Sequence, residues 1–249
     1  MQTAGETVNG FSGLSVVIPT IDEIEDVKEV VSVILNSCKK EDICDIALIY
    51  APFSEKSFVE HLYTIKDTYP DIAFNICCQS GKGVGDAVQC GIKMSKGSHI
   101  TMIGADMEND PADLAVMIEL SKQYPDHIIT GSRRLTRDGF SEYPKIKTIL
   151  NLCFQLVLKI LFNTKGSDVT YLFQSTPAHI IKEHEFICPE AFVLELALLA
   201  ETENLPFREF PSKVCRRKHG ASHLTFRYHI GFMKATFRIF LRTKGREKK

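Results

Sequence analysis

The run Leu14-Ser-Val-Val-Ile-Pro19 decides the fold class, because a short β-branched stretch stopped by proline is typical of a buried strand. The residues from Asp22 to Leu35 carry apolar side chains at helical spacing, so a helix is expected to follow the strand. The same order then repeats, with strands expected at 45–50, 72–77, 99–103 and 126–130 and helices at 57–69, 85–95 and 111–124. This alternation predicts an α/β fold with a mostly parallel central sheet and helices on both faces.

Composition places the chain among ordinary globular proteins. Its 249 residues are 44% hydrophobic and 24% charged, which excludes disordered, collagen-like and coiled-coil classes. The 30 Lys and Arg balance 31 Asp and Glu, so the whole-molecule charge of -1 indicates no nucleic-acid partner. Residues 1–9 lack the pattern of a secretory signal, and the eight cysteines lack metal-ligand spacing. We therefore expect a cytoplasmic protein with reduced thiols.

Ligand sites in parallel sheets lie at the carboxyl ends of the strands, so the loops there are the places to seek chemistry. The loop Gln79-Ser-Gly-Lys-Gly-Val-Gly85 precedes a helix, and its amides together with Lys82 could hold a diphosphate. The alternative is a flexible turn. The loop fits neither the dinucleotide pattern Gly-x-Gly-x-x-Gly nor a Walker loop.

An acidic loop follows the strand expected at 99–103. In Gly104-Ala-Asp-Met-Glu-Asn-Asp-Pro111 the carboxylates occupy alternate positions, Asp106, Glu108 and Asp110. Hard oxygen ligands in this pattern suit Mg²⁺ or Mn²⁺ bridging the phosphates of a nucleotide substrate. The alternative is capping of the next helix by Asn109 or Asp110, which does not account for Asp106.

Two later segments carry further candidates. Gly131-Ser-Arg-Arg134 ends the fifth expected strand, and its guanidinium groups could bind phosphate or form surface salt bridges. Gly166-Ser-Asp-Val-Thr170 places Asp168 in a turn, where the carboxylate could be a general base or could stabilise the turn itself.

The last part of the chain differs from the alternating region. Residues 143–162 form an apolar segment interrupted by polar side chains, which predicts either a buried helix or one lying in a membrane interface. Residues 213–249 are rich in Lys and Arg interleaved with aromatic side chains, and Glu247 is their only acid. Such a cationic amphipathic segment can lie on anionic lipid, bind a polyanion or form a solvated face.

Taken in order, these motifs resemble glycosyltransferase family 2, and more closely its branch that transfers sugars to polyprenyl phosphates, such as dolichyl-phosphate mannose synthases. The motifs are Ser15-Val-Val-Ile-Pro-Thr-Ile-Asp-Glu23, Gly83-Val-Gly85, the strand leading to Asp106, Ser167-Asp168-x-Thr170-x-x-Phe173, Phe192-x-x-Glu195, Glu209-x-Pro211 and Arg217-x-x-Gly220-x-Ser222. The resemblance implies a GT-A fold over residues 10–225, a nucleotide-sugar donor and a divalent metal, with residues 226–249 as a basic amphipathic segment.

The resemblance also implies roles for single residues. The donor would be bound by Pro19, Thr20, Glu23, Lys82, Gly83 and Arg133. The metal would be held by Asp106 and Glu108, and the catalytic residues would be Asp106, Asp168 and Glu195, of which Asp168 and Glu195 would lie near the transferred sugar. The acceptor phosphate would meet Arg133, Arg217 and Ser222. An already ionised phosphate acceptor requires no strong general base.

The sequence departs from the family pattern at several motif positions. Tyr50-Ala-Pro-Phe-Ser54 stands where Asp-Asp-Gly-Ser is usual, and Gly104 replaces the first acid of Asp-Ala-Asp. Gln174 and His223 replace the expected Arg and Lys. The leading expectation is a metal-dependent transferase with peripheral contact at the cytoplasmic membrane face. The alternatives are a non-catalytic binding or regulatory domain and a soluble transferase with a non-lipid acceptor.

Overall fold

The computed structural model describes residues 10–186, 192–215 and 226–246, with the side chains of the last range described over 233–243. The strands are β1 (Leu14–Thr20), β2 (Ile43–Tyr50), β3 (Phe74–Cys78), β4 (His99–Met102), β5 (Ile128–Ser132), β6 (Gln174–Pro177) and β7 (Phe207–Pro211). The α-helices are α1 (Ile24–Ser37), α2 (Lys56–Thr68), α3 (Gly83–Met94), α4 (Leu114–Gln123), α5 (Lys145–Phe162), α6 (Ala178–Glu183), α7 (Phe192–Thr202) and α8 (Phe226–Arg246). Short 3-10 turns are η1 (Lys40–Asp42), η2 (Pro111–Asp113) and η3 (Arg133–Leu135).

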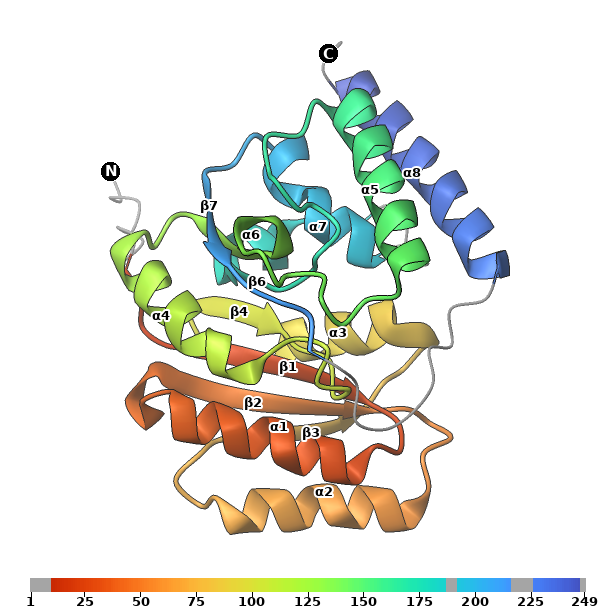
Figure 1. The fold of residues 1–249 in the computed structure, drawn as a ribbon. Helices are drawn as coiled ribbons and strands as arrows, with labels where there is room; N and C mark the ends of the chain where they lie inside the picture. The colour runs from red at the N-terminus through yellow and green to blue at the C-terminus, as the bar shows by residue number, and fades with distance from the viewer. Residues whose placement is uncertain (1–9, 187–191, 216–225, 247–249) are drawn as a thin grey trace, which may run out of the picture.

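The strands form one seven-stranded sheet in the order β3-β2-β1-β4-β6-β5-β7 (Figure 1). The pairs β1–β2, β1–β4, β2–β3 and β5–β7 are parallel, whereas β6 runs antiparallel to both of its neighbours. The predicted α/β fold with a mostly parallel sheet is therefore confirmed. The strands β6 and β7 lie outside the five that the sequence predicts, and β6 separates β4 from β5.

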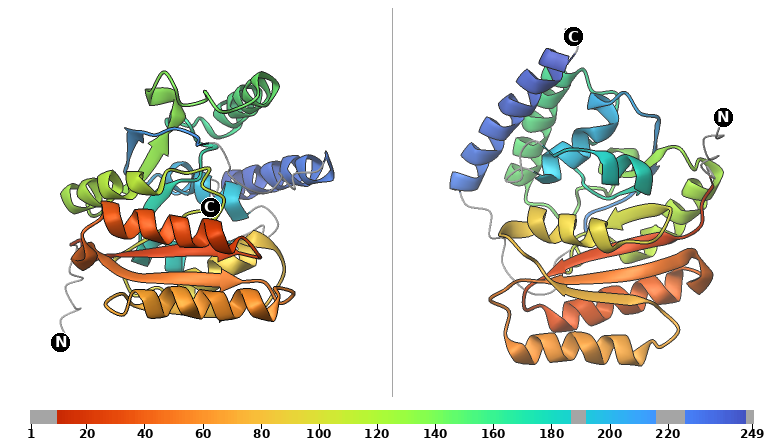
Figure 2. Two further views of the ribbon diagram at one scale, coloured as in Figure 1. Left: turned by 60° about the horizontal axis from the view of Figure 1, so that its bottom comes forward. Right: turned by 180° about the vertical axis from the view of Figure 1, so that it is seen from behind.

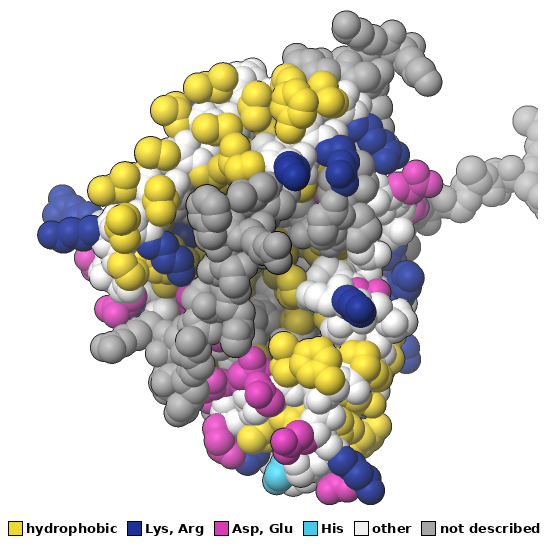
Figure 3. Space-filling model, turned by 90° about the vertical axis from the view of Figure 1, so that its right-hand side faces the viewer, with side chains coloured by type: hydrophobic (Ala, Val, Ile, Leu, Met, Phe, Trp, Pro, Cys, Tyr) yellow, Lys and Arg dark blue, Asp and Glu magenta, His cyan; other side chains and the backbone are white. Residues whose placement is uncertain are grey.

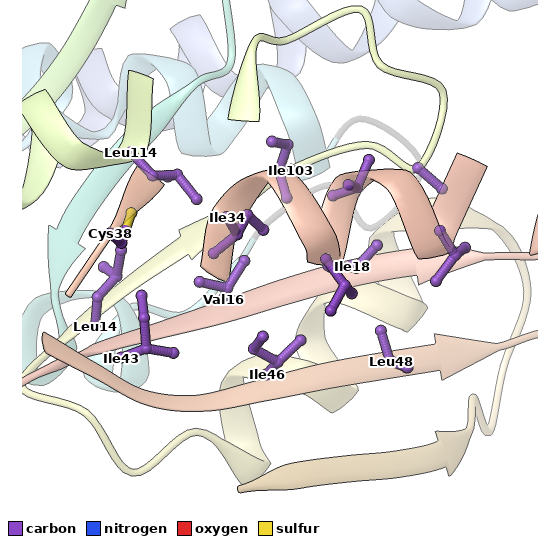
Figure 4. Packing of buried hydrophobic residues seen from close by; sticks show 14 of the residues in the cluster. Leu14, Val16, Ile18, Ile34, Cys38, Ile43, Ile46, Leu48, Ile103 and Leu114 are labelled. Carbon is purple, nitrogen blue, oxygen red and sulfur yellow. The ribbon is translucent and has the colours of Figure 1, made fainter. Parts of the chain in front are cut away.

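Strand β1 shows why the sheet is buried on both faces. Leu14, Val16 and Ile18 point into a cluster formed with α1, α2 and α4, part of which Figure 4 shows. Val17 points the other way, into a second cluster with α3, α6 and α7. All four side chains are fully buried. A continuous apolar run is what a strand covered by helices on both sides requires.

The predicted apolar helix over residues 143–162 exists as α5, but it is not a buried helix. Only Gln155 and Leu158 of its side chains are buried. Leu158 packs in a small cluster with side chains of α7 and α8, and the Phe162 ring meets the Phe240 ring edge-on with 5.8 Å between centroids. Helices α5 and α8 consequently lie side by side at one end of the molecule (Figures 1 and 2). Among the described residues, no helix combines the length and hydrophobicity needed to cross a bilayer.

Candidate functional site

The turn from β1 to α1 is organised by one carboxylate. Glu23 accepts hydrogen bonds from the backbone amides of Ile21 and Asp22, at 3.0 and 3.1 Å, and from the Thr20 hydroxyl at 3.3 Å. Burial opposes the charge of Glu23, but these hydrogen bonds outweigh it and lower the pKa of the carboxyl. Thr20 and Glu23, both predicted to bind the donor, therefore fix the shape of the turn that follows Pro19.

The turn after β2 packs on the turn after β1. The Ser54 hydroxyl donates a 2.7 Å hydrogen bond to the Ile21 carbonyl, which holds the two turns together at the carboxyl edge of the sheet. Beside it Phe53 leaves 74% of its surface exposed. Sequence reasoning assigned no role to Phe53; an aromatic residue directly after a strand end was the signal available. An exposed ring at this edge offers a flat apolar surface to a ligand.

The loop before α3 is closed by an acidic residue of its own helix. The Asp86 carboxylate accepts a 2.6 Å hydrogen bond from the Gly81 amide, and the Gln79 side chain donates to the Gly81 carbonyl at 3.1 Å. Gly83 has φ +81°, a conformation that favours glycine, and Lys82 occupies the N-cap position of α3. These contacts give the loop a defined conformation and engage the Gly81 amide with Asp86. Donor binding by Lys82 and Gly83 stays a prediction.

The acidic loop after β4 has a fixed backbone. The Asp106 carboxylate accepts a 3.2 Å hydrogen bond from the Glu108 amide across Met107, whose φ is +59°. The Glu108 carbonyl accepts from the Cys215 amide at 2.9 Å. Asp110 caps the following 3-10 turn, accepting from the Ala112 amide at 3.0 Å. The capping alternative is therefore confirmed for Asp110, whereas the Asp106 carboxylate accepts from the Glu108 amide instead.

The acidic loop supplies only some of the oxygen ligands that a hard divalent ion requires. In the described portion of the chain there is no group of three or more His, Cys, Asp or Glu side chains placed to hold a metal. However, Mg²⁺ is commonly bound through one or two carboxylates, with substrate phosphates and water completing the octahedron. Asp106 and Glu108, both half-buried, fit that arrangement. The loop can contribute to a metal site that substrate phosphates complete.

Arg133 and Asp168 form a buried ion pair behind this edge. The guanidinium donates to Asp168 at 2.6 Å from Nε and at 2.7 Å from a terminal nitrogen, and their side chains are 2% and 0% exposed. Asp168 also accepts from the Gln155 amide at 2.8 Å, and the Arg133 guanidinium stacks near the rings of Phe140 and Tyr171. Burial opposes the charge of Arg133, but Asp168 outweighs it and raises the pKa of the guanidinium.

This pair bears on the roles predicted for both residues, which stay predictions. Arg133 was expected to meet a donor or acceptor phosphate, but its guanidinium is buried and engaged in a two-pronged contact with Asp168. Asp168 was expected near the transferred sugar, but it accepts hydrogen bonds from α5 and from the end of β5. Spacing along the chain predicted that Arg133 follows the fifth strand and that Asp168 lies in a turn. It could not show that they neutralise each other.

Three predicted residues remain, and the structure describes only one of them, Glu195. Glu195 is only 3% exposed and accepts a hydrogen bond from His184 at 3.2 Å. Its position near the sugar stays a prediction. Arg217 and Ser222, predicted for the acceptor phosphate, lie outside the described residues. Lys147 of α5 was not predicted. Its ammonium lies 3.8 Å from the Glu108 carboxylate and brings a cation to the acidic loop.

Comparison with protein families and solved structures adds two findings. The family model described as glycosyl transferase family 2 matches residues 15–188. Glucosyl-3-phosphoglycerate synthase from Mycobacterium tuberculosis, solved with Mn²⁺, UDP and phosphoglyceric acid, superposes with a TM-score of 0.69 at 10% identity, over 93% of this chain and 78% of that one. Its complex with Mg²⁺ and UDP gives 0.67 at 10% identity, over 94% and 80%. At these identities the likeness shows the fold.

Proposed function

Because this chain belongs to glycosyl transferase family 2, we propose that it moves a sugar from a nucleotide-sugar donor to a phosphate-bearing acceptor. The observation that carries the proposal is the acidic loop with Asp106 and Glu108 at the carboxyl end of β4, which pairs in parallel with β1, the strand that leads into the Glu23 turn. The loops after β1, β2 and β4 converge there, since parallel strands end at one edge of the sheet.

The donor half of the proposal uses the loops after β1, before α3 and after β4, each of which has internal hydrogen bonds. Pro19, Thr20 and Glu23 would border the nucleotide on one side, and Lys82 with Gly83 would approach its phosphates from α3. Asp106 and Glu108 would hold Mg²⁺ or Mn²⁺, as the metal-bound mycobacterial structures suggest. The chemistry supplied by such an ion is neutralisation of the charge on the departing nucleoside diphosphate.

The acceptor half of the proposal is a polyprenyl phosphate at the cytoplasmic membrane face. A phosphate oxygen is already ionised and needs no base to attack the anomeric carbon of the donor sugar. This agrees with the engagement of Asp168 and Glu195 in buried pairs rather than in proton transfer. Lys147, together with Arg217 and Ser222, would attract the acceptor phosphate. The proposal assigns catalysis to residues 10–225.

A soluble phosphorylated acceptor is the second candidate. The mycobacterial enzyme was solved with phosphoglyceric acid, which also presents a phosphate to a transferase of this fold. The two candidates share the donor site and differ in the attacking group, which is an ionised phosphate oxygen in a polyprenyl phosphate and a hydroxyl that must lose its proton in phosphoglycerate. Turnover of the donor with a polyprenyl phosphate or with 3-phosphoglycerate, measured as nucleoside diphosphate release, separates them.

The donor site is tested by thermal unfolding with each nucleoside diphosphate, with and without Mn²⁺. One nucleotide with metal should raise the Tm by on the order of 5 °C at about 100 times its Kd, because it binds only the folded state. Asp106→Asn should abolish the rise without lowering the Tm of the free protein. Asp110→Asn is the matched control, since Asn also caps helices. No shift with any nucleotide would instead indicate a non-catalytic domain, for which the glycine at position 104 would be the reason.

A further inference from the structure

Helix α5 exposes an apolar face to solvent along its whole length. Ile146, Ile149, Leu150, Leu156 and Ile160 are each 59% to 74% exposed. On the opposite side, Asn151 and Gln155 make hydrogen bonds within the protein and Leu158 packs in a buried cluster. Burying large side chains of this kind is favourable by roughly 1.5–3 kcal/mol each. A face that leaves several of them exposed to water therefore indicates a binding surface.

Helix α8 extends the same apolar surface. Met233, Phe237 and Leu241 recur at helical spacing and are 48%, 56% and 56% exposed. Helix α8 packs against α5 through Ile239 and Leu158, so the two exposed stripes share one end of the molecule. Figure 3 shows hydrophobic side chains gathered over the upper part of this face, with Lys and Arg side chains beside them.

The charges of these two helices all have one sign. Neither α5 nor α8 contains Asp or Glu. Their cationic residues are Lys145, Lys147, Lys159, Arg227, Lys234, Arg238, Arg242, Lys244 and Arg246. Lys145, Lys159, Lys234 and Arg238 are among those that lie exposed. Acids of other elements approach two of these cations, Glu185 at 3.9 Å from Arg242 and Glu108 at 3.8 Å from Lys147. An apolar face on two helices that themselves carry only cations complements a surface that is apolar within and anionic at its rim.

We propose that this two-helix face, formed by the exposed apolar side chains of α5 and α8, lies in the headgroup region of an anionic lipid bilayer. Helices with such faces rest in the interface plane with their apolar side chains at the acyl boundary. Each Lys or Arg near the anionic surface strengthens the binding by about fivefold. This inference rests on the proposed function, because an enzyme that uses a lipid-linked acceptor must reach a membrane.

A second copy of the chain is a poorer occupant of the same face. A two-fold dimer pairs each patch with itself, so the cations of α5 and α8 would face their own copies across the interface. Like charges placed opposite one another in an interface oppose association. Lipid headgroups carrying phosphate remove this cost and neutralise the same cations.

The inner side of α5 joins this face to the acidic loop. Lys147, in the first turn, approaches Glu108 at 3.8 Å, and Asn151 donates to the Thr170 hydroxyl at 2.8 Å. One turn later Gln155 donates to Asp168. A bilayer on the outer side of α5 is therefore one helix away from the acidic loop. In this placement, the phosphate of a lipid-linked acceptor would lie in the headgroup layer, on the same side of the molecule as Lys147.

Vesicle binding tests the inference without requiring activity. The full chain should co-sediment with phosphatidylcholine vesicles that contain phosphatidylglycerol, and the binding should weaken as salt is raised. Ile149→Glu and Ile160→Glu should each weaken it by about tenfold or more, because a carboxylate would have to enter the apolar layer. Val116→Glu on α4 adds the same charge at an exposed apolar position on the far side of the molecule (Figure 1) and should leave the binding unchanged.

Charge removal and nucleotide binding complete the test. Lys159→Gln combined with Arg238→Gln should lower binding to the anionic vesicles by about 25-fold, in line with fivefold for each cation. The nucleotide-induced rise in Tm should persist in Ile149→Glu, so failure of the surface and failure of the donor site give different results. The inference is overturned if the chain does not bind anionic vesicles, or if Val116→Glu weakens binding as much as Ile149→Glu. It is also overturned if the effect of Ile160→Glu is to dissociate a dimer instead of weakening vesicle binding.

Discussion

Arg133 and Asp168 are both buried, and the contacts between them offset the free-energy cost of removing two charges from water. The pair is joined by two short contacts, Gln155 donates a further hydrogen bond to the carboxylate, and aromatic rings cover the guanidinium. Removing one partner from such a pair leaves an uncompensated buried charge, whereas replacing both by apolar groups can be nearly neutral. The two side chains are therefore expected to stabilise the end of β5 only as a pair.

Substitution of Asp168 by Ala should lower the free energy of unfolding by about 3–5 kcal/mol, because Arg133 stays buried without its counter-charge. Urea unfolding measures this loss. The combined change Arg133→Met and Asp168→Leu should recover most of the stability, since Met packs well against aromatic rings. Asp138→Ala, at an exposed position, should change the stability by about 0.5 kcal/mol or less. A loss below about 1 kcal/mol in Asp168→Ala would contradict the structural role.

Gly104 offers a direct test of the metal proposal. A side chain at this position would point toward the Asp106 carboxylate, with its Cβ 2.9 Å from Oδ1, so Asp106 must turn slightly to accept it. Gly104→Asp should then tighten the apparent Kd for Mn²⁺ in the presence of nucleoside diphosphate by on the order of tenfold, as one more carboxylate joins the site. Gly104→Asn is the uncharged control of the same size. Equal Mn²⁺ affinities in the two variants, measured by calorimetry, would exclude this loop as the metal site.

At the scale of elements, the turn between β1 and α1 depends on an ionised Glu23. Its folded pKa is lowered, so its contribution to stability is present above the ordinary value of 4.5 and is lost as pH falls through the folded value. Glu23→Gln should therefore be less stable than the wild type at neutral pH, and the difference should shrink in acid. Urea midpoints measured between neutral pH and about pH 4 check this. Glu41→Gln, at an exposed position, should show no comparable trend; a pH-independent gap for Glu23→Gln would refute the assignment.

The elements that could be predicted from the sequence are those with a regular pattern. The β-branched run of β1 and the helical spacing in α1 gave both elements nearly at their observed bounds. Strand β6 is Gln-Ser-Thr-Pro, which has no apolar alternation although all four residues are buried, so nothing local marks it as a strand. In the candidate site the acidic loop was predicted because its pattern is local. The Arg133–Asp168 pairing was not, since partners 35 residues apart meet only through the fold.

At the scale of the whole molecule, the position of α5 can be checked through its cysteine. Cys153 is exposed on the outer side of the helix, whereas Cys38 is buried and burial raises the pKa of its thiol to about 11. Maleimide at neutral pH should therefore modify Cys153 rapidly and leave Cys38 unmodified. Peptide mass mapping over time measures both rates. Protection of Cys153 in the free protein would mean that α5 is covered, and comparable reaction of Cys38 would contradict its burial.

The antiparallel strand β6 has a consequence for biosynthesis. Because β6 stands between β4 and β5, the parallel strands β1 to β4 can pair as soon as residues 14–102 have left the ribosome, but β5 cannot join them until residues 174–177 emerge. During translation the edge of β4 therefore stays unpaired while more than seventy intervening residues, including helix α5, are synthesised. For that interval the nascent chain exposes both an unpaired strand edge and an apolar helix face, a combination that favours aggregation until β6 pairs with β4.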